Sequence, residues 1–260
     1  MAKVYYQNDS VTLYHGDCFE VMATLAPGSF AAAITDPPYG HNNNNNDLIA
    51  RRELALGRKE EAKAARPRPI ANDGPEATEI FERFCKEAAR LCCCCCCCCC
   101  CGGGGPEPQF ARWALILDKY FSFAQQVIWD KGKMGMGWHY RRSTECILVA
   151  YNKKLKKAPW YSTSHKIENI IRPGDYGIKK IIPSAGDHPT PKPVALFEHF
   201  IRLHTPEGGA ILDPFAGAGT AGIAAMRTGR RAVLVELEER WCELAANRME
   251  NEIKSKEESK

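Results

Sequence analysis

The stretch Ile211-Leu-Asp-Pro-Phe-Ala-Gly-Ala-Gly-Thr220 decides the fold of this 260-residue chain. It begins within a short apolar strand, 210–212, that ends at Asp213, passes through a glycine-rich turn and opens a helix over 217–228. A second apolar strand, 231–235, follows that helix. Strands that alternate with helices in this way predict an α/β chain with a doubly wound, mostly parallel sheet.

The glycines of this stretch have the spacing of a cofactor-binding turn. Gly217, Gly219 and Gly222 match G-x-G-x-x-G, and Glu236 stands at the end of the next strand. Glycine lets the backbone approach a bound molecule closely, and the acid can accept hydrogen bonds from ribose hydroxyls. The pattern also suits a nicotinamide-dependent dehydrogenase. Asp213 argues against that reading, because dinucleotide phosphates favour positive charge, whereas a cationic sulfonium cofactor accepts an acid nearby.

The rest of the chain continues the alternation of strands and helices. The unbroken apolar run Phe30–Thr35 is typical of a strand that is buried on both faces. By the same periodicity we expect further strands at 11–14, 92–101, 125–129 and 146–151, and helices at 18–25, 76–91, 110–121, 194–203 and 238–250.

A second motif, Asp36-Pro37-Pro38-Tyr39, directly follows the buried strand 30–35. Two prolines make a stiff turn that leaves backbone carbonyls free to accept hydrogen bonds. A carboxylate and a carbonyl together could localise the lone pair of an exocyclic amino nitrogen and stabilise the positive charge that develops there. Tyr39 offers an aromatic face on which a base could stack. By itself the motif would also serve as a simple strand-ending turn.

Both motifs together resemble those of the amino-methylating DNA methyltransferases. These enzymes share D/N/S-P-P-Y/F, here 36–39, and F-x-G-x-G, here Phe215-Ala-Gly-Ala-Gly219. The catalytic motif precedes the cofactor motif, as in the permuted β arrangement of the family. The resemblance implies a circularly permuted, Rossmann-like methyltransferase sheet with a small DNA-recognition insert. It also implies S-adenosyl-L-methionine as cofactor and double-stranded DNA, with the target base flipped out of the duplex, as partner.

The resemblance assigns residues to three roles. The catalytic set is Asp36, Pro37, Pro38 and Tyr39. The cofactor-binding set is Asp17, Asp36, His188, Thr190, Lys192, Asp213, Phe215, Gly217, Gly219, Thr220 and Glu236. The DNA-binding set is Lys131, Lys133, His139, Arg141, Arg142, Lys179 and Lys180. Other readings stay open at this point, since Asp17 could cap a helix, 188–193 could be a rigid linker and the basic residues could be a solvated face.

The resemblance favours the N6 amino group of adenine as the target, because Asp is commoner at the first motif position among adenine enzymes. Methylation of the N4 amino group of cytosine is the first alternative. A nicotinamide-dependent Rossmann enzyme and an inactive, DNA-binding or designed scaffold are the others. Methylation of a cytosine ring carbon would need a Pro-Cys nucleophile, and the sequence has no such pair. Methylation of protein glutamine ranks lower, because Asn is usual at the position of Asp36.

Length and charge indicate one methyltransferase domain over residues 1–260, with a variable insert at 41–75 and a small basic target-recognition region at 138–187. Between residues 131 and 192 the chain carries 13 Lys and Arg against 4 Asp and Glu, which is typical of a face that binds phosphates. No apolar run predicts a membrane span or a secretory signal, so we expect a cytoplasmic protein. Monomer and homodimer stay open.

Homopolymer runs interrupt the pattern at 42–46 (Asn), 92–101 (Cys) and 102–105 (Gly). Ten of the 14 cysteines lie in the one run, and the others are scattered without a metal-ligand spacing, so no metal site is expected. Cysteine behaves as a small hydrophobe, so its run could serve as a crude buried strand. The runs resemble filler in a designed sequence and receive no chemical role.

Overall fold

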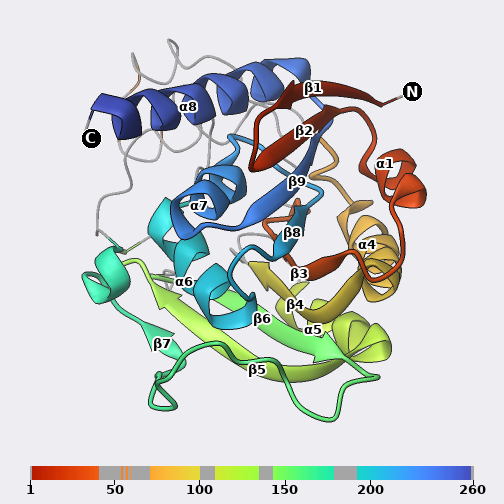
Figure 1. Cartoon of the computed structure of the whole chain (residues 1–260). Coiled ribbons are helices and arrows are strands. Elements are labelled where there is room, and N and C mark those ends of the chain that lie inside the picture. The colour runs from red at the N-terminus through yellow and green to blue at the C-terminus, as the bar shows by residue number, and fades with distance from the viewer. Residues whose placement is uncertain are drawn as a thin grey trace.

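The structure, a computed structural model, describes residues 2–40, 71–99, 109–134, 143–178 and 192–258, together with positions 54, 57 and 59. Its strands form one sheet in the order β1-β2-β9-β8-β3-β4-β6-β5-β7 (Figure 1). They are β1 (Lys3–Gln7), β2 (Val11–His15), β3 (Phe30–Thr35), β4 (Cys92–Cys99), β5 (Phe121–Asp130), β6 (Thr144–Asn152), β7 (Ile170–Ile171), β8 (Ala210–Asp213) and β9 (Arg231–Glu236).

The centre of the sheet is parallel and its margins are mixed. Neighbouring strands from β2 through β9, β8 and β3 to β4 all pair in parallel. Strand β6 runs antiparallel to both β4 and β5, and β1 runs antiparallel to β2. The late strand β8 therefore lies beside the early strand β3. This confirms the predicted doubly wound, mostly parallel sheet in its permuted chain order.

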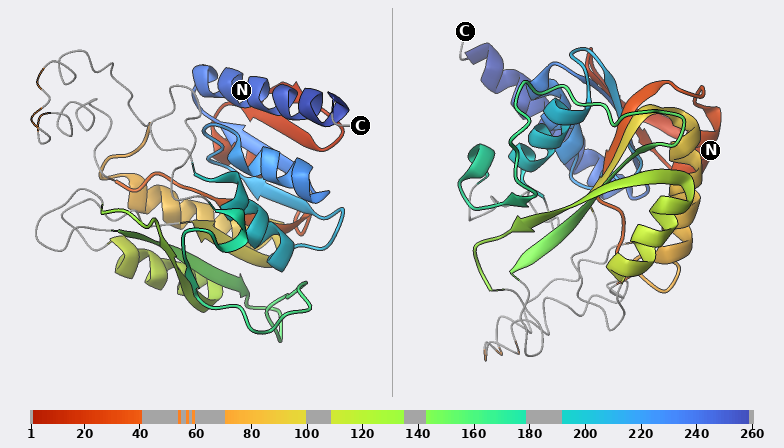
Figure 2. Two further views of the ribbon diagram at one scale, coloured as in Figure 1. Left: turned by 90° about the vertical axis from the view of Figure 1, so that its left-hand side faces the viewer. Right: turned by 90° about the horizontal axis from the view of Figure 1, so that it is seen from below.

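Helices cover both faces of the sheet (Figure 2). One layer holds α6 (Val194–His204), α7 (Thr220–Thr228) and α8 (Glu239–Glu258), and the other holds α1 (Cys18–Thr24), α4 (Ala77–Leu91) and α5 (Gln109–Tyr120). Successive strand residues point to opposite faces. Ala32 and Ile34 of β3 accordingly pack in the first layer, and Ala33 packs in the second. The unbroken apolar run of β3 is thus explained by burial on both sides.

The structure corrects several predicted elements. Strands β1 and β7 were not expected, since β1 is an edge strand with a polar surface and β7 has only two residues. Strand β5 already begins at Phe121, where a helix was still expected. Helix α8 continues to Glu258 instead of ending at 250. Its last turns are exposed and charged, so they carry no apolar periodicity that could have predicted them.

The structure describes only part of each predicted insert. Of 41–75 the structure describes 71–75 and the three single positions, and of the basic region 138–187 it describes 143–178. That part contains β6, β7 and the short 3-10 turn η2 (Asp175–Gly177), with irregular backbone between them. The cysteine run forms β4 over residues 92–99, as predicted. No helix among the described residues is long and apolar enough to cross a bilayer.

Candidate active site

The two predicted motifs meet at the carboxyl ends of β3 and β8. These strands pair in parallel, with Ala32 opposite Ile211 and Ala33 opposite Leu212, so both end at the same edge of the sheet. After β8 the chain crosses to β9 on one side, and after β3 it crosses to β4 on the other. Such a switch point is where open α/β sheets bind ligands.

A buried hydrogen bond joins the two strand ends directly. The hydroxyl of Thr35 donates to Oδ1 of Asp213 over 2.5 Å, and the backbone N–H of Phe215 donates to the same oxygen over 3.1 Å. Burial raises the pKa of the Asp213 carboxyl to about 7, although these two donors lower it. The carboxylates of Asp36 and Glu236 raise it further. Asp213, predicted to lie near the cofactor, thus fixes the start of the glycine-rich turn.

The other end of the turn is fixed by Glu236. The backbone N–H of Gly217 donates to Oε2 of Glu236 over 2.8 Å, and the backbone N–H of Glu238 donates to Oε1 over 2.8 Å. The turn is therefore tied to β8 at one end and to β9 at the other. Burial raises the pKa of Glu236, although backbone donors, including those of Glu238 and Gly217, lower it.

Not all three glycines face a ligand. At Gly219, where φ is +73°, an added Cβ would lie 2.7 Å from Cβ of Ala245 in α8. At Gly222 an added Cβ would lie 2.8 Å from Leu234 and 2.9 Å from Met249. These two glycines are needed for close packing of α7 against α8 and β9. Gly217, with φ +48°, is the one at which backbone freedom serves the turn itself.

The Asp36-Pro-Pro-Tyr39 turn is held by two further side chains. Lys192, directly before α6, places its Nζ 2.7 Å from Oδ2 of Asp36 and donates to the hydroxyl of Tyr39 over 3.0 Å. The hydroxyl of Tyr39 donates to Oδ1 of Asp36. The backbone N–H groups of Tyr39 and Gly40 donate to Oδ1 of Asp73 over 2.9 and 2.8 Å. The turn is thus rigid at both its acid and its aromatic end.

The charges around Asp36 act in opposite directions. Burial raises the pKa of the Asp36 carboxyl, the ammonium of Lys192 and the hydroxyl of Tyr39 lower it, and the carboxylate of Glu145 raises it. Lys192 is predicted from sequence as a cofactor ligand, and the structure brings it to the carboxylate of Asp36, which is predicted to be catalytic. Its side chain is only 8% exposed. A buried lysine needs such a partner.

Two residues of this site were not anticipated, Asp73 and Glu145. Asp73 lies in Ala71-Asn-Asp-Gly74, a sequence typical of a turn, which could have predicted that its side chain binds nearby backbone. It could not have predicted the hydrogen bond with Gly40, which is 33 positions away. Glu145 stands in β6, where a charged residue in an otherwise apolar strand was the available signal. Its carboxylate lies 3.6 Å from Lys192 and 3.1 Å from Lys131.

Aromatic rings support Tyr39 from behind. Its ring lies 6.1 Å from the ring of Trp113 in α5, which stacks on Phe81 of α4 at 4.2 Å. Trp113 and Phe81 are fully buried. The second helix layer therefore sets the position of the aromatic face that the motif presents.

The remaining predicted residues are distributed as follows. Exposed Asp17 accepts the N–H groups of Phe19 and Glu20 and so caps α1, while its neighbour Gly16 donates to the backbone carbonyl of Glu236. Asp17 therefore lies at the same sheet edge as Glu236 and also acts as a helix cap.

Of the predicted DNA-binding residues, Lys131 is paired with Glu145, whereas Lys133 is exposed. His139, Arg141, Arg142, Lys179, Lys180, His188 and Thr190 lie outside the described residues.

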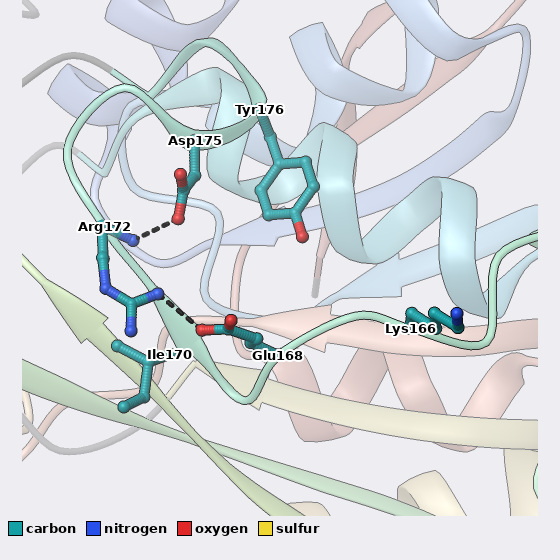
Figure 3. A pocket seen from close by; sticks show the side chains of 6 residues that line it. All are labelled: Lys166, Glu168, Ile170, Arg172, Asp175 and Tyr176. Atoms are coloured by element: carbon teal, nitrogen blue, oxygen red, sulfur yellow. Dashed lines mark hydrogen bonds and ion pairs between the residues drawn. The ribbon is translucent and has the colours of Figure 1, made fainter.

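A separate hollow of about 290 Å³ lies in the predicted recognition region (Figure 3). Arg172 lines it and makes two hydrogen bonds there. Its guanidinium donates to Glu168 over 2.6 Å, and its backbone N–H donates to Asp175 over 2.7 Å. The Tyr176 ring lies 3.8 Å from the ring of His199. No predicted catalytic or cofactor residue lines the hollow, whose lining is Lys166, Glu168, Ile170, Arg172, Asp175 and Tyr176.

The donor set at the strand ends fits S-adenosylmethionine. The carboxylates of Asp36 and Glu236 are each close enough to Asp213 to raise its pKa, and a sulfonium and an ammonium group are favoured beside such acids. A dinucleotide pyrophosphate would meet carboxylates of its own negative charge and be repelled, which disfavours the dehydrogenase alternative. Among the described residues no cluster of His, Cys, Asp and Glu is arranged to hold a metal ion.

A permuted, doubly wound sheet with a glycine turn and an acid-Pro-Pro-Tyr turn at its switch point defines an S-adenosylmethionine-dependent methyltransferase. A family model described as DNA methylase, of the N6/N4 type, matches residues 30–247. The chain belongs to this family, and the predicted activity class and cofactor are thereby confirmed: it is an S-adenosylmethionine-dependent DNA methyltransferase.

Individual relatives agree over nearly the whole chain. It is 27% identical to the Type II methyltransferase M2.DpnII of Streptococcus pneumoniae, over 97% of this chain and 94% of that one. The M1.HpyAVI–SAM complex shares the fold with a TM-score of 0.59 and 24% identity, covering 92% of this chain and 98% of that one. The cytosine-N4-specific PvuII DNA methyltransferase matches with a TM-score of 0.62 and 18% identity, covering 94% and 88%.

Proposed function

We propose that this enzyme methylates the N6 amino group of adenine at a specific site in double-stranded DNA. The observation that carries the proposal is the Asp36 carboxylate, which is held at the switch point by Lys192 on one oxygen and by the Tyr39 hydroxyl on the other. It lies one residue beyond Thr35, whose hydroxyl is bonded to the start of the cofactor turn. The Asp36 carboxylate and the glycine-rich turn are therefore neighbours.

The proposed chemistry uses the hydrogen-bond acceptors of this turn. When bound, S-adenosylmethionine supplies a methyl group on a cationic sulfur. Asp36 and the backbone carbonyl of Pro37 accept the two amino hydrogens of the target base, which localises the nitrogen lone pair. They then stabilise the positive charge that develops on the nitrogen in the transition state. The ammonium of Lys192 favours the ionised form of the Asp36 carboxyl, and an ionised carboxylate is the better acceptor.

The aromatic end of the turn holds the target base. A base that leaves the duplex loses its stacking partners, and an aromatic ring in the pocket replaces them. Tyr39 is half-buried and backed by Trp113. The hydroxyl of Tyr39 donates a hydrogen bond to one oxygen of Asp36, and the amino group of the target base replaces it there.

Cofactor binding is assigned to the carboxyl edges of β8, β9 and β2. Gly217 and Phe215 form the turn, Glu236 would accept hydrogen bonds from the ribose hydroxyls, and Asp17 follows β2 at the same edge. Thr220 begins α7 and is largely buried, so its role is in the turn. Asp213 acts through the turn, because its Oδ1 is already bonded to Thr35 and Phe215.

We propose adenine rather than cytosine as the target base because the first residue of the motif is an aspartate, Asp36. The PvuII enzyme, which is cytosine-N4-specific, has only 18% identity to this chain, so its specificity does not transfer. The relative from Streptococcus pneumoniae is a Type II methyltransferase, which supports methylation within a defined recognition sequence.

Double-stranded DNA is assigned to the edge of the sheet at which Asp36 lies. Lys131 and Lys133 follow β5, which ends beside the start of β6 and Glu145, and Lys133 is exposed. An exposed lysine at this edge suits a phosphate, and phosphate contacts position the duplex without reading its sequence.

The test is to incubate the purified protein with duplex DNA and methyl-labelled S-adenosylmethionine, digest the DNA and identify nucleosides by mass spectrometry. We expect N6-methyladenine from the wild type and none from Asp36→Ala. Asp9→Ala, an exposed acid in the turn between β1 and β2, is the matched control and should methylate like the wild type. Methylcytosine as the product would replace the adenine assignment. A folded protein that methylates no DNA would leave only the inactive-scaffold reading.

A further inference from the structure

Four alternating charges from four parts of the chain form one line that ends at the Asp36 carboxylate. Lys131 follows β5, Glu145 lies in β6, Lys192 precedes α6 and Asp36 follows β3. The Nζ of Lys131 lies 3.1 Å from Oε1 of Glu145, and Oε2 of Glu145 lies 3.6 Å from Nζ of Lys192. The Nζ of Lys192 lies 2.7 Å from Oδ2 of Asp36.

The line is largely shielded from water. The side chain of Glu145 is 17% exposed and that of Lys192 is 8% exposed. Charges removed from water are stable only with partners, and loss of one partner leaves the other uncompensated. With two cations and two anions, the line is neutral as a whole. Removal of Glu145 would leave an excess positive charge beside Asp36, and removal of Lys192 would leave two carboxylates facing each other.

We infer that Glu145 is a positioning residue for the methyl transfer: it holds the ammonium of Lys192 against Asp36, and so holds the Asp36 carboxylate in the orientation that accepts the target amino group. This inference rests on the proposed function of Asp36. Lys192 contacts Asp36, Tyr39 and Glu145, so Glu145 is a second anionic partner that fixes the ammonium. Lys131 fixes Glu145 in turn.

The pKa shifts of Glu145 and Asp36 agree with this chain of contacts. Burial raises the pKa of Glu145, but the ammonium groups of Lys192 and Lys131 hold it below its ordinary value. For Asp36 the ammonium of Lys192 lowers the pKa and the carboxylate of Glu145 raises it. Two other titratable groups face Asp36: the Tyr39 hydroxyl, which lowers its pKa, and the Asp213 carboxyl, whose pKa Asp36 raises. Replacement of Lys192 and replacement of Glu145 therefore shift the pKa of Asp36 in opposite directions.

The experiment has a readout that needs no activity. The carboxyl carbon of Asp36 is titrated by ¹³C NMR in the protein alone, with Asp36→Asn to assign the signal. Lys192→Met is expected to raise the pKa of Asp36, and Glu145→Gln to lower it. Lys119→Met and Glu82→Gln, which break an exposed pair with a 2.5 Å contact, are the matched controls and should leave the Asp36 titration unchanged.

Single-turnover methylation then separates positioning from binding. For Glu145→Gln we expect a rate on the order of 10-fold lower at the pH plateau, with Kd values for S-adenosylmethionine and for duplex DNA within about twofold of wild type. The acid limb of its rate profile should move to lower pH, and that of Lys192→Met to higher pH. Glu145→Asp, which keeps the charge, should recover part of the rate.

Three results would overturn the inference. One is a Glu145→Gln enzyme with the wild-type rate. A second is an unshifted Asp36 titration in both variants. A third is a loss of rate matched by an equal loss of DNA affinity. If Glu145→Gln does not fold, the Lys192→Met titration and the Glu145→Asp rate decide. A wild type without methyltransferase activity would refute the proposed function and leave the NMR test of the charge line standing.

Discussion

The hydroxyl of Tyr39 donates its hydrogen bond to the carboxylate that the proposed chemistry needs as an acceptor. This bond has to be replaced when a base enters, whereas the ring has to stay as a stacking surface. The two parts of the side chain therefore contribute differently, and two substitutions separate them.

Tyr39→Phe should methylate DNA within a few-fold of the wild-type rate, because it keeps the ring and removes only the competing donor. Tyr39→Ala should lose about 10- to 100-fold in kcat/KM for DNA, the equivalent of the roughly 1–3 kcal/mol that a base gains by stacking on an aromatic ring. Steady-state kinetics on one duplex checks both. Equal losses in the two variants would mean that the hydroxyl, not the ring, carries the function.

Asp213 should make the stability of the protein depend on pH. Its pKa rises to about 7 in the folded state from an ordinary value of 3.8, so the folded state binds this proton more tightly than the unfolded state does. The resulting stabilisation is complete below about pH 4 and is lost as the pH rises through 7. Asp213→Asn keeps an acceptor for Thr35 and Phe215 but cannot ionise.

Urea unfolding of wild type and Asp213→Asn between pH 4 and 8 tests this. The free energy of unfolding of the wild type should fall relative to that of the variant by an amount on the order of 4 kcal/mol at most across the range. Parallel pH profiles for the two proteins would show that Asp213 has an ordinary pKa.

Residue types and spacing were sufficient to predict the acid-Pro-Pro-Tyr turn and the glycine turn, because each motif is contiguous. Glu145 and Asp73 were not predictable in the same way. Their contacts with Lys192 and with the backbone of Tyr39 join positions far apart in the sequence, and only the tertiary arrangement of β6 and of residues 71–75 brings them together. Lys192 was found as a site residue, but its contact with Asp36 was not foreseen.

At the scale of elements, α7 and α8 approach so closely that a single methyl group matters. Gly219→Ala should destabilise the protein by about 2–4 kcal/mol, since it adds a 2.7 Å contact with Ala245 to the cost of a positive φ. Gly229→Ala is the matched control. Its φ is +69° and no atom lies within 4 Å of the added Cβ, so it should lose only about 1–2 kcal/mol. Equal unfolding free energies for the two variants would contradict the packing argument.

Strand β4 shows what a sequence pattern can and cannot specify. A run of small apolar residues after a helix was enough to predict a strand at 92–101, and the structure has one at 92–99. Its register was not predictable, because every residue of a homopolymer is the same and a slip by one position places the same side chain on each face. Contacts with β3 and β6 set the register instead, including the shift between Phe30 and Ala32.

For the molecule as a whole, basic residues at the edge of the sheet that holds Asp36 should make DNA binding sensitive to salt. Replacement of Lys133 by Ala should lower the slope of log Kd against log salt concentration by about 1, if it contacts one phosphate. Fluorescence anisotropy between about 50 and 200 mM salt measures it. The control is the double variant Lys86→Ala and Lys254→Ala, exposed residues of α4 and α8, whose slope should equal that of the wild type.

The permuted order of the sheet has a consequence for the making of the protein. Strands β2 and β3 are consecutive along the chain, yet β9 and β8 lie between them in the sheet. On a ribosome that adds 5–20 residues per second, about 10 to 35 s separate the synthesis of β3 from that of β8. Throughout that interval the nascent chain carries two strand edges whose partners do not yet exist. Translation speed and chaperone supply, rather than the final stability, should therefore limit the yield of active enzyme.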